Sequence, residues 1–557
     1  MDNLRIILWA LFGGMLFVTW QQWQIDNAAP VVMPVAQQPV SATPSAQALP
    51  QPVEPSLPAP GTSAAVPTTP QLNAPAVSAT VGQNPADTIV VETDVFRVEI
   101  SRQGGNLVSA LLPVYPVSKD RPNEPVQLLN STPGFTYVIE TGLVDGAQGG
   151  PTHLTALTAP LSRYALAPDQ QVLTVPLTWR SPEGIEVTKV YTFKRGRYDV
   201  DLEYQIANRS DSEWRALDYL QIRRAHNPPE RSMFDVDSYS FNGPVFYDSE
   251  SYDKLDPDDF RDEPLKAQLE GGWLASIEHH FLSAAVPAVD AVYSYSSAYT
   301  SGLYTLRASG PTLVVPPDSA TSVSAQFFVG PKLQEQLEET APGLALTVDY
   351  GVLALLAQPL FWVLQQIFNL VGNWGWSIII VTLLIKLTFY KLTETSGRSM
   401  AKMRKLQPRL KALQERYKDD RQQLSMKMMD LYKQEKVNPA AGCLPMLIQI
   451  PFFIAFYWVL LESVEMRQAP FALWITDLST KDPFFVLPLL MGIAMFIQQK
   501  LNPAPPDPVQ AKVMTILPII FTVFFAFFPS GLVLYWLSNS VLSVAQQWNI
   551  NRKMAVD

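Results

Sequence analysis

The sequence predicts a polytopic α-helical membrane protein with six transmembrane helices, both termini inside, a large antiparallel β-sandwich domain outside and a helical hairpin inside. Three observations predict this fold class. Apolar segments occur at the start and in the last third of the chain, and alternating strand-like segments fill the region between them. The charge is also divided, because residues 1–385 hold 21 Lys and Arg against 39 Asp and Glu, whereas residues 386–557 hold 20 against 12.

Residues 1–25 are predicted to form an N-terminal transmembrane anchor, because the stretch from Leu4 to Trp20 is apolar. A cleaved signal peptide is the alternative, since Ala28 and Ala29 follow closely. Tryptophans at the far end of the stretch favour the uncleaved anchor, because tryptophan suits the membrane interface. The Pro- and Ala-rich residues 26–87 cannot bury a core, so we expect a flexible tether.

Residues 88–341 are predicted to form the β-sandwich with a short C-terminal helix. Their short segments alternate apolar and polar positions, are rich in β-branched and aromatic residues, and are separated by turn residues. The clearest pair is GIEVTKVYTF and YDVDLEYQIANRS, joined at residues 194–197, which predicts a β-hairpin.

Residues 342–374 are predicted to hold an amphipathic helix that lies in the outer membrane interface. The apolar stretch 353–372 contains Pro359 and is interrupted by polar side chains. A membrane-spanning helix is the alternative. The spacing of the polar positions and the break at GNWGW favour the interfacial helix.

The membrane body is predicted to begin with a second span at 375–391, and four further spans complete it within 443–549. A short tail, 550–557, follows. The connection 391–437 holds 13 Lys and Arg against 6 Asp and Glu, whereas 462–482 holds 2 against 4. By the positive-inside rule the first connection is cytoplasmic and the second lies outside.

The cytoplasmic connection, 392–442, is predicted to form a helical hairpin, because its apolar residues repeat every three or four positions on both sides of KDDRQQ. Its outer faces are basic. One interpretation is a solvated hairpin near anionic lipid; the other is a docking surface for a partner such as a ribosome or a targeting factor. The candidate docking cations are Lys402, Arg404, Lys405, Arg409 and Lys411.

The second span holds a cation, Lys386, in the apolar run WSIIIVTLLIKLTFYKL. If the span begins near Gly375, Lys386 lies near the middle of the hydrocarbon core. A central lysine costs about 2.5–3.5 kcal/mol, which the neighbouring aliphatic residues roughly offset. We therefore expect the cation to face protein or water. The alternative is that Lys386 extends to the cytoplasmic interface.

Other polar side chains of the spans would line a hydrated intramembrane groove together with Lys386. Thr382 lies one turn earlier on the same helical face. The remaining members expected in this groove are Gln449, Gln498, Ser538, Asn539 and Ser543.

Several long motifs resemble the YidC/Oxa/Alb family of membrane protein insertases, of the Gram-negative type. They are GNWGWSIIIVTLLIK, SMAKMRKLQPRLKAL, EKVNPAAGCLPMLIQIPFF, SVEMRQAPFALWITDLS and FPSGLVLYW, in the family's order over the whole chain. The resemblance implies an inner-membrane insertase and chaperone that acts alone or with the Sec translocon, with its β-domain in the periplasm. It implies as partners nascent membrane proteins, Sec components, the ribosome, the signal recognition particle receptor and the phospholipid bilayer.

The resemblance also assigns groove residues. The family's groove cation corresponds to Lys386, where most members have arginine, and Thr382 matches another groove position. The family's aromatic of the last span falls on Trp536, where tyrosine is usual, next to Tyr535. Lysine lacks the bidentate fork of arginine, so the requirement is predicted to be positive charge.

We expect no enzyme activity, cofactor, metal site or direct nucleic-acid site. The chain contains no G-x-x-x-x-G-K-[ST] or G-x-G-x-x-G motif, which argues against a nucleotide-driven motor. His279 and His280 are expected on opposite faces of a strand, which disfavours a shared metal ion. Two other classes remain open. A transporter or proton relay would use Lys386 for ion coupling but needs acidic partners in the spans, and an envelope-binding scaffold would leave the groove pattern unexplained.

Overall fold

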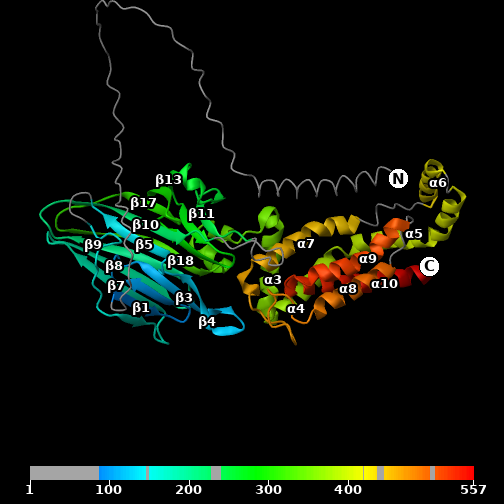
Figure 1. The fold of residues 1–557 in the computed structure, drawn as a ribbon, viewed down its shortest axis with the longest axis horizontal. Helices are drawn as coiled ribbons and strands as arrows, with labels where there is room; N and C mark the ends of the chain where they lie inside the picture. Colours follow the sequence, from blue (N-terminus) through cyan, green and yellow to red (C-terminus); the bar gives the residue numbers. More distant parts are fainter. Residues whose placement is uncertain are drawn as a thin grey trace, which may run out of the picture. The chain divides into compact units, whose positions relative to one another are not determined.

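The computed structural model describes residues 87–145, 150–227, 240–417, 420–435, 444–501 and 508–556 (Figure 1). The expected anchor and nearly all of the tether lie outside these residues. Arg416–Asp430 belongs to a compact unit separate from the one that holds the β-domain and the other described helices.

The predicted β-sandwich is confirmed as two large sheets. The first follows the order β13-β16-β17-β10-β5-β3-β2-β1-β6, with β4 paired to β3, and the second follows β12-β11-β14-β15-β18-β9-β8-β7. All pairings are antiparallel except β1 with β6. The strands of the first sheet are β1 (Thr88–Glu92), β2 (Arg97–Ser101), β3 (Leu107–Ser118), β4 (Arg121–Leu129), β5 (Tyr137–Val144), β6 (Arg163–Ala165), β10 (Trp214–Ala225), β13 (Lys266–Glu270), β16 (Val292–Thr300) and β17 (Leu303–Val315). Those of the second are β7 (Val172–Arg180), β8 (Ile185–Lys194), β9 (Asp199–Asn208), β11 (Gly243–Tyr247), β12 (Tyr252–Lys254), β14 (Trp273–Ile277), β15 (Phe281–Val286) and β18 (Ser319–Pro331).

The predicted hairpin is β8 paired with β9, where Ile185 faces Asn208 and Phe193 faces Val200. Alternate residues of β8 are buried, as period-two patterning requires. One of them is Lys189, which is 1% exposed. Its Nζ donates to the carbonyls of Gly104 and Gly105, both at 2.9 Å, so the buried amino group is hydrogen-bonded.

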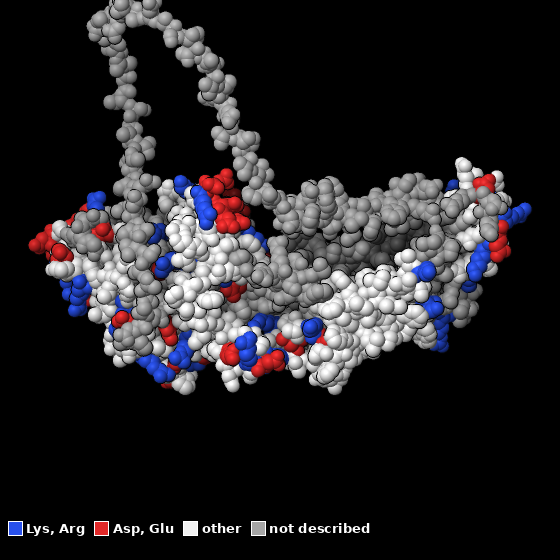
Figure 2. Space-filling model, in the orientation of Figure 1, with Lys and Arg blue, Asp and Glu red and all other residues white. Residues whose placement is uncertain are grey.

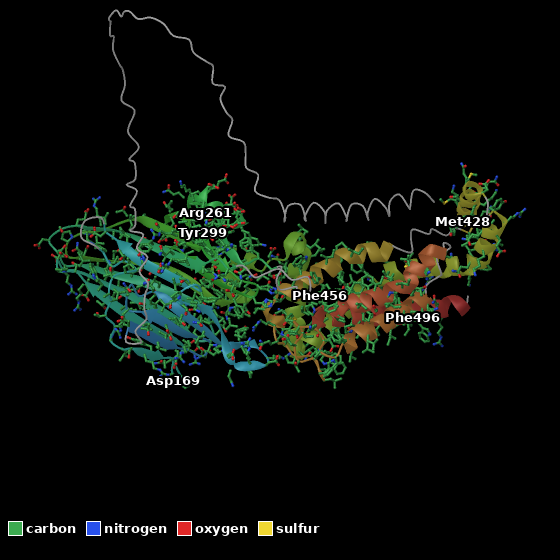
Figure 3. All side chains as sticks on the ribbon, viewed as in Figure 1. Asp169, Arg261, Tyr299, Met428, Phe456 and Phe496 are labelled. Carbon is green, nitrogen blue, oxygen red and sulfur yellow. The ribbon has the colours of Figure 1, made fainter. Side chains whose placement is uncertain are left out.

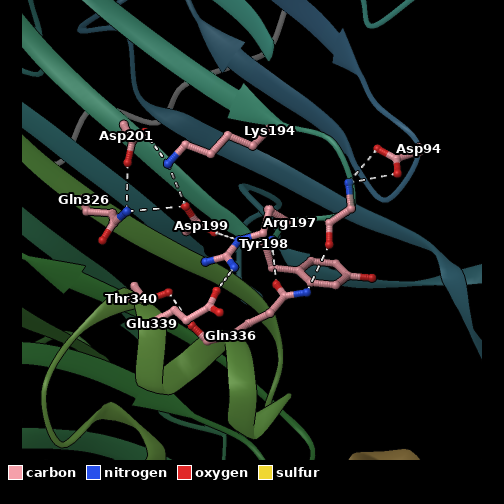
Figure 4. Close-up of polar contacts among 11 residues, drawn as sticks. Asp94, Lys194, Arg197, Tyr198, Asp199, Asp201, Gln326, Gln336, Glu339 and Thr340 are labelled. Atoms are coloured by element: carbon pink, nitrogen blue, oxygen red, sulfur yellow. Dashed lines mark hydrogen bonds and ion pairs between the residues drawn. The ribbon is translucent and has the colours of Figure 1, made fainter. Parts of the chain in front are cut away.

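Helix α2 (Gln334–Thr340) is fixed to the turn between β8 and β9 (Figure 4). The backbone N–H of Tyr198 donates to Gln336 Oε1 at 3.1 Å, and Gln336 Nε2 donates to the carbonyl of Gly196 at 3.0 Å. Arg197 forms ion pairs with Asp199 and with Glu339 of α2. The predicted C-terminal helix of the β-domain is therefore part of its folded body.

The helical body follows the β-domain. Its helices are α3 (Ala354–Val371), α4 (Trp374–Thr388), α5 (Tyr390–Arg416), α6 (Arg421–Gln434), α7 (Leu444–Glu462), α8 (Val486–Leu501), α9 (Pro508–Phe525) and α10 (Ser530–Val556). Short 3₁₀ turns η3 (Asp259–Arg261), η4 (Leu344–Thr347), η5 (Gly351–Leu353) and η7 (Val464–Met466) complete the described elements. Helix α10 packs against α4 and α8, while α3 packs against α4 and α7.

Length and hydropathy identify one helix of the described chain that is able to cross a membrane, Gly351–Val371. Trp374–Thr388 and Tyr390–Ser399 pass the same test together but bend by 63° at Phe389. Shorter apolar helices are Ile448–Glu462, Val486–Leu501 and Lys512–Phe525. Six spans therefore stay a prediction, as does the interfacial position of 353–372.

The second expected span, 375–391, includes nearly all of helix α4. Helix α4 ends at Thr388, and the N–H of Phe389 closes its last turn on the carbonyl of Ile385 at 3.1 Å. The ring of Phe389 packs edge-on against Phe452, with centroids 5.2 Å apart. This contact with α7 accompanies the bend, which periodicity along one segment does not reveal.

The segment after α7 is hydrogen-bonded to strand β3. Arg467 donates to the carbonyls of Pro116 at 2.9 Å and Val117 at 3.0 Å, and Gln468 donates to the carbonyl of Pro116 at 2.9 Å. The guanidinium of Arg467 also lies 5.4 Å from the ring centroid of Phe281. We call these contacts of Arg467 and Gln468 with β3 the junction.

Glu465, next to the junction, should make stability pH-dependent. Its Oε2 is buried without a hydrogen-bond partner among the described residues, and burial raises the pKa of Glu465 to about 7. The native state therefore holds a proton that the unfolded chain releases at lower pH, so this group lowers stability as pH rises from about 4.5 to about 7. The unfolding temperature in detergent should fall less steeply with rising pH over this range for Glu465→Gln than for the native chain. The exposed Glu335→Gln is the matched control, and equal slopes for Glu465→Gln and the native chain would contradict the assignment.

Candidate functional site

Lys386 is the centre of the candidate site. Helix α4 supplies an apolar environment, and the side chain of Lys386 is buried, with 8% of the residue exposed. Its Nζ donates to Ser543 Oγ of α10 at 2.8 Å, and Ser543 Oγ donates in turn to the carbonyl of Asn539 at 2.7 Å. Within the described ranges, no carboxylate forms an ion pair with Lys386. The side chain thus faces protein, and its partner is a neutral hydroxyl.

The expected depth of Lys386 near the middle of the hydrocarbon core stays a prediction. Lys386 lies in the last turn of α4, because the helix ends two residues later at Thr388. A cation in the last turn interacts favourably with the unpaired carbonyls of a helix C-terminus. The cost of placing it in an apolar segment is reduced accordingly.

Thr382 lies on the same face of α4 as Lys386 but makes no direct contribution to its hydrogen bonding. It is 1% exposed, and its Oγ1 donates to the carbonyl of Ile378 at 2.6 Å. A hydroxyl satisfied within its own helix needs no water. Thr382 therefore permits close packing of α4 without introducing an unpaired donor.

Tyr535 and Trp536 belong to an aromatic cluster that joins three helices. Tyr535 packs on Phe453 and Phe456 of α7, with ring centroids 5.8 Å and 4.7 Å away (Figure 3 labels Phe456). Trp536 packs edge-on against Phe453 at 4.7 Å and contacts Phe525 of α9 at 5.2 Å. The Nε1 of Trp536 is buried without a hydrogen-bond partner in the described chain. The cluster places a large apolar surface about two helical turns before Ser543, the hydrogen-bond partner of Lys386, along α10.

The other expected groove residues are only partly buried. Gln449 of α7 and Ser538 and Asn539 of α10 are half-buried. Asn539 is linked to Lys386 through its backbone carbonyl and Ser543, and no direct side-chain hydrogen bond joins Lys386 to Gln449 or Ser538 in the part of the chain that the structure describes. The structure thus brings together Lys386, Ser543 and the Asn539 backbone out of the predicted set.

The candidate docking cations lie on α5. Lys402, Lys405, Arg409 and Lys411 are exposed, and the side chain of Arg404 lies outside the described set. Arg409 forms an ion pair with Glu435 at 2.7 Å. Basic side chains are visible on this helix in Figure 2. Most of these cations therefore remain accessible to an acidic partner.

Helices α8 and α9 expose many large apolar side chains, and Figure 2 shows a surface there with few charges. On α8 these include Leu489, Leu490, Ile493, Phe496 and Ile497, and on α9 they include Ile516, Ile519, Ile520, Val523 and Phe524. Apolar surface of this extent marks contact with lipid or a partner. A solvated globular protein would bury it.

The expectation for His279 and His280 is wrong in its geometry. Both lie in the turn between β14 and β15, and their rings are 3.8 Å apart at the centroids. Burial is the largest cause that lowers the pKa of His279 to about 3.

Elsewhere in the described chain His226, Asp256 and Asp258 hold ligand atoms within 4.8 Å of one another, but both aspartates are exposed.

Sequence reasoning missed the aromatic partners Phe453, Phe456 and Phe525 and the junction formed by Arg467. The aromatic residues lie in the apolar runs of the expected spans, where nothing distinguishes them from lipid-facing residues. The junction depends on backbone carbonyls, which have no sequence signal.

A helical body with exposed apolar surface and a buried cation, joined to a large β-sandwich, defines a membrane-embedded protein with a folded domain outside the lipid. Residues 366–557 match the family described as 60Kd inner membrane protein, and residues 88–363 match the YidC periplasmic domain. The chain belongs to the YidC family of membrane protein insertases. The β-sandwich is accordingly its periplasmic domain.

Relatives named membrane protein insertase YidC extend over the whole chain. The one from Thioalkalivibrio sulfidiphilus (strain HL-EbGR7) is 46% identical over 568 residues, which cover 100% of this chain and 99% of the relative. The one from Nitrosococcus oceani is 46% identical over 558 residues, with coverage of 100% and 99%. A solved structure titled "Active YidC insertase crystal structure with the first transmembrane domain resolved" is 19% identical, covers 82% of this chain and 92% of its own, and gives a TM-score of 0.39.

Proposed function

We infer that this protein inserts membrane proteins into the inner membrane by offering a positively charged, hydrated groove to their polar segments. The observation that supports the groove most directly is Lys386, a buried cation whose hydrogen-bond partner is the neutral Ser543. Because no carboxylate of the described residues forms an ion pair with Lys386, its charge would attract an acidic segment strongly in a medium of low dielectric constant. The groove residues are Lys386, Thr382, Gln449, Tyr535, Trp536, Ser538 and Asn539.

The driving force is the partition of the substrate's apolar helix into lipid. A helix of about 20 apolar residues gains more by entering the bilayer than a short polar tail loses while it crosses. The groove shortens the distance that the tail travels without water. No covalent bond changes in this process, so the protein acts on partitioning and needs no catalytic residue.

The proposed topology has six spans with both termini in the cytoplasm. The anchor is 1–25, the tether is 26–87, the periplasmic domain is 88–341 and the interfacial helix is 342–374. The second span is 375–391, and 443–549 completes the membrane body before the tail at 550–557. The cytoplasmic hairpin is 392–442. The charge difference between 391–437 and 462–482 supports this orientation.

The partners follow from the same arrangement. Nascent membrane proteins and the bilayer contact the groove and the apolar faces of α8 and α9. We propose that the ribosome and the signal recognition particle receptor contact the hairpin, and that the Sec translocon shares substrates with the membrane body.

Reconstitution tests the function. Purified full-length protein in lipid vesicles should insert a single-span substrate with a short acidic outer segment, measured by protection of that segment from protease. Protein-free vesicles are the control. Protection that is no greater with the protein than without it would contradict the inference.

The hairpin cations should act in recruitment. Replacing Lys402, Arg409 and Lys411 together by glutamate reverses charge on an exposed face, and we expect ribosome binding to fall by about tenfold in low salt and less in high salt. Sedimentation of ribosomes with protein-containing vesicles measures this. Unchanged ribosome binding together with loss of insertion of every substrate would place the hairpin in the insertion step instead.

A further inference from the structure

A cavity of about 220 Å³ lies between the β-domain and the end of α7. It is far larger than the roughly 10–15 Å³ of cavity volume that one water needs. Strand β12, the end of β18 and the turn η4 supply one side, and α7 supplies the other. The lining residues that matter here are Ser240, Phe241, Lys254, Lys332, Asp349, Trp458 and Glu462.

Two side-chain polar groups of this cavity have no hydrogen-bond partner among the described residues. Lys332 is 2% exposed, and its ammonium donates no hydrogen bond to a residue that the structure describes, although its backbone N–H is bonded to the carbonyl of His280. The hydroxyl of Ser240 is likewise buried without a partner among the described residues. Buried polar groups are normally satisfied. An ammonium and a hydroxyl facing the same cavity are suited to the oxygens of an anionic group.

The ionisable lining groups are balanced in charge. Lys254 is paired with Asp349 and lies 5.3 Å from the ring centroid of Phe241. Glu462 is 6% exposed, and among the neighbouring carboxylates it raises the pKa of Lys332 most. Burial lowers the pKa of Lys332 to about 8, so the ammonium stays mostly protonated at neutral pH. Two cations and two carboxylates sum to zero, so a zwitterion enters without leaving net buried charge.

We propose that this cavity binds the phosphoethanolamine headgroup of a membrane lipid. The phosphate accepts hydrogen bonds from Lys332 and Ser240, and the primary ammonium donates to Glu462. The lipid is favoured over the free headgroup because Tyr457 and Trp458 line the cavity at the end of the apolar helix α7, as aromatic residues do at a membrane interface. This assignment relies on the proposed topology, in which α7 ends at the outer surface of the membrane.

Native mass spectrometry of the full-length protein in detergent tests the proposal, with dioleoyl phosphatidylethanolamine and dioleoyl phosphatidylcholine as probes. The native chain should bind the ethanolamine lipid about tenfold more tightly, because a choline headgroup has no N–H to donate to Glu462. Glu462→Gln should reduce this preference, because it removes the charged acceptor of the ammonium, whereas Lys332→Gln should weaken binding of both lipids, because both carry the phosphate that Lys332 contacts. Lys266→Gln, an exposed lysine of β13, is the matched control and should keep the preference.

A third variant guards against misfolding of Glu462→Gln and Lys332→Gln. Ser240→Phe fills the cavity, leaves every charge in place and should abolish the preference. Equal binding of the two lipids by the native chain would overturn the proposal, as would a preference that survives in the folded Ser240→Phe variant. Displacement of the lipid by free phosphoethanolamine at the same concentration would overturn the lipid as the source. Insertion activity is measured on the same preparation of the native chain. If the native chain inserts its substrate normally but binds the two lipids equally, only the headgroup proposal is contradicted and the proposed insertase function stands.

Discussion

Replacing Lys386 by glutamate is expected to abolish insertion of substrates with acidic outer segments. The change puts a carboxylate where a buried ammonium donates to Ser543, which reverses the local field and repels an acidic segment. Lys386→Ala removes the attraction without adding repulsion. The insertion rate should fall by at least about tenfold, which corresponds to an insertion barrier higher by roughly 1.4 kcal/mol. Lys386→Arg keeps the positive charge, so this variant should support growth of the depleted strain. Complementation of a strain depleted of this protein, with protease protection of a reporter, measures both effects.

Two further variants sharpen this test. Lys391→Glu changes an exposed cation five residues later and should leave insertion nearly unchanged. Ser543→Ala removes the partner of Lys386 but not its charge, so we expect a smaller loss than with Lys386→Ala. Growth with glutamate that equals growth with lysine at position 386 would rule out the electrostatic role.

Replacing Trp273 by alanine is expected to cost the periplasmic domain about 3–5 kcal/mol of stability. Trp273 is 0% exposed, its ring stacks on Tyr247 at 5.3 Å, and its Nε1 donates to the carbonyl of Pro342 at 3.0 Å. The substitution leaves a cavity in the core beside β14, and it leaves the carbonyl of Pro342 without its donor. Denaturant unfolding of the full-length protein, followed by near-ultraviolet circular dichroism, measures the loss.

Trp362 provides the comparison for this experiment, because it lies on α3 and is 64% exposed. Trp362→Ala removes the same chemical group from a position with little packing, so unfolding of the β-domain should shift by less than about 1 kcal/mol. Similar losses in the two variants would show that Trp273 does not anchor the domain.

Local patterns predicted the β-domain well. The alternation in β8 and β9 identified their hairpin, and in the structure Lys189 lies on the buried face of β8. What the pattern did not contain is the acceptor of Lys189, since the carbonyls of Gly104 and Gly105 lie more than 80 positions away in the chain. Strand periodicity sets the direction of a side chain, whereas its partner depends on tertiary packing.

The candidate site shows the same division. The sequence identified Lys386 because a cation in an apolar segment is costly, and it included Ser543 among the polar residues of the last span. Their hydrogen bond joins residues 157 positions apart and follows from the packing of α4 on α10. The bend at Phe389 and the close, tilted rings of His279 and His280 were missed, because each arises from contacts or turns that a single segment does not reveal.

The two sides of the junction between the β-domain and the helical body do not tolerate substitutions equally. On the strand side the acceptors are the carbonyls of Pro116 and Val117, which every amino acid supplies. On the helix side the donors are the side chains of Arg467 and Gln468, which few residues replace. Mutations can therefore accumulate in β3 without breaking the link, whereas one substitution at Arg467 removes two hydrogen bonds. These hydrogen bonds of the periplasmic domain therefore depend on the side chains of Arg467 and Gln468 and not on the side chains of β3.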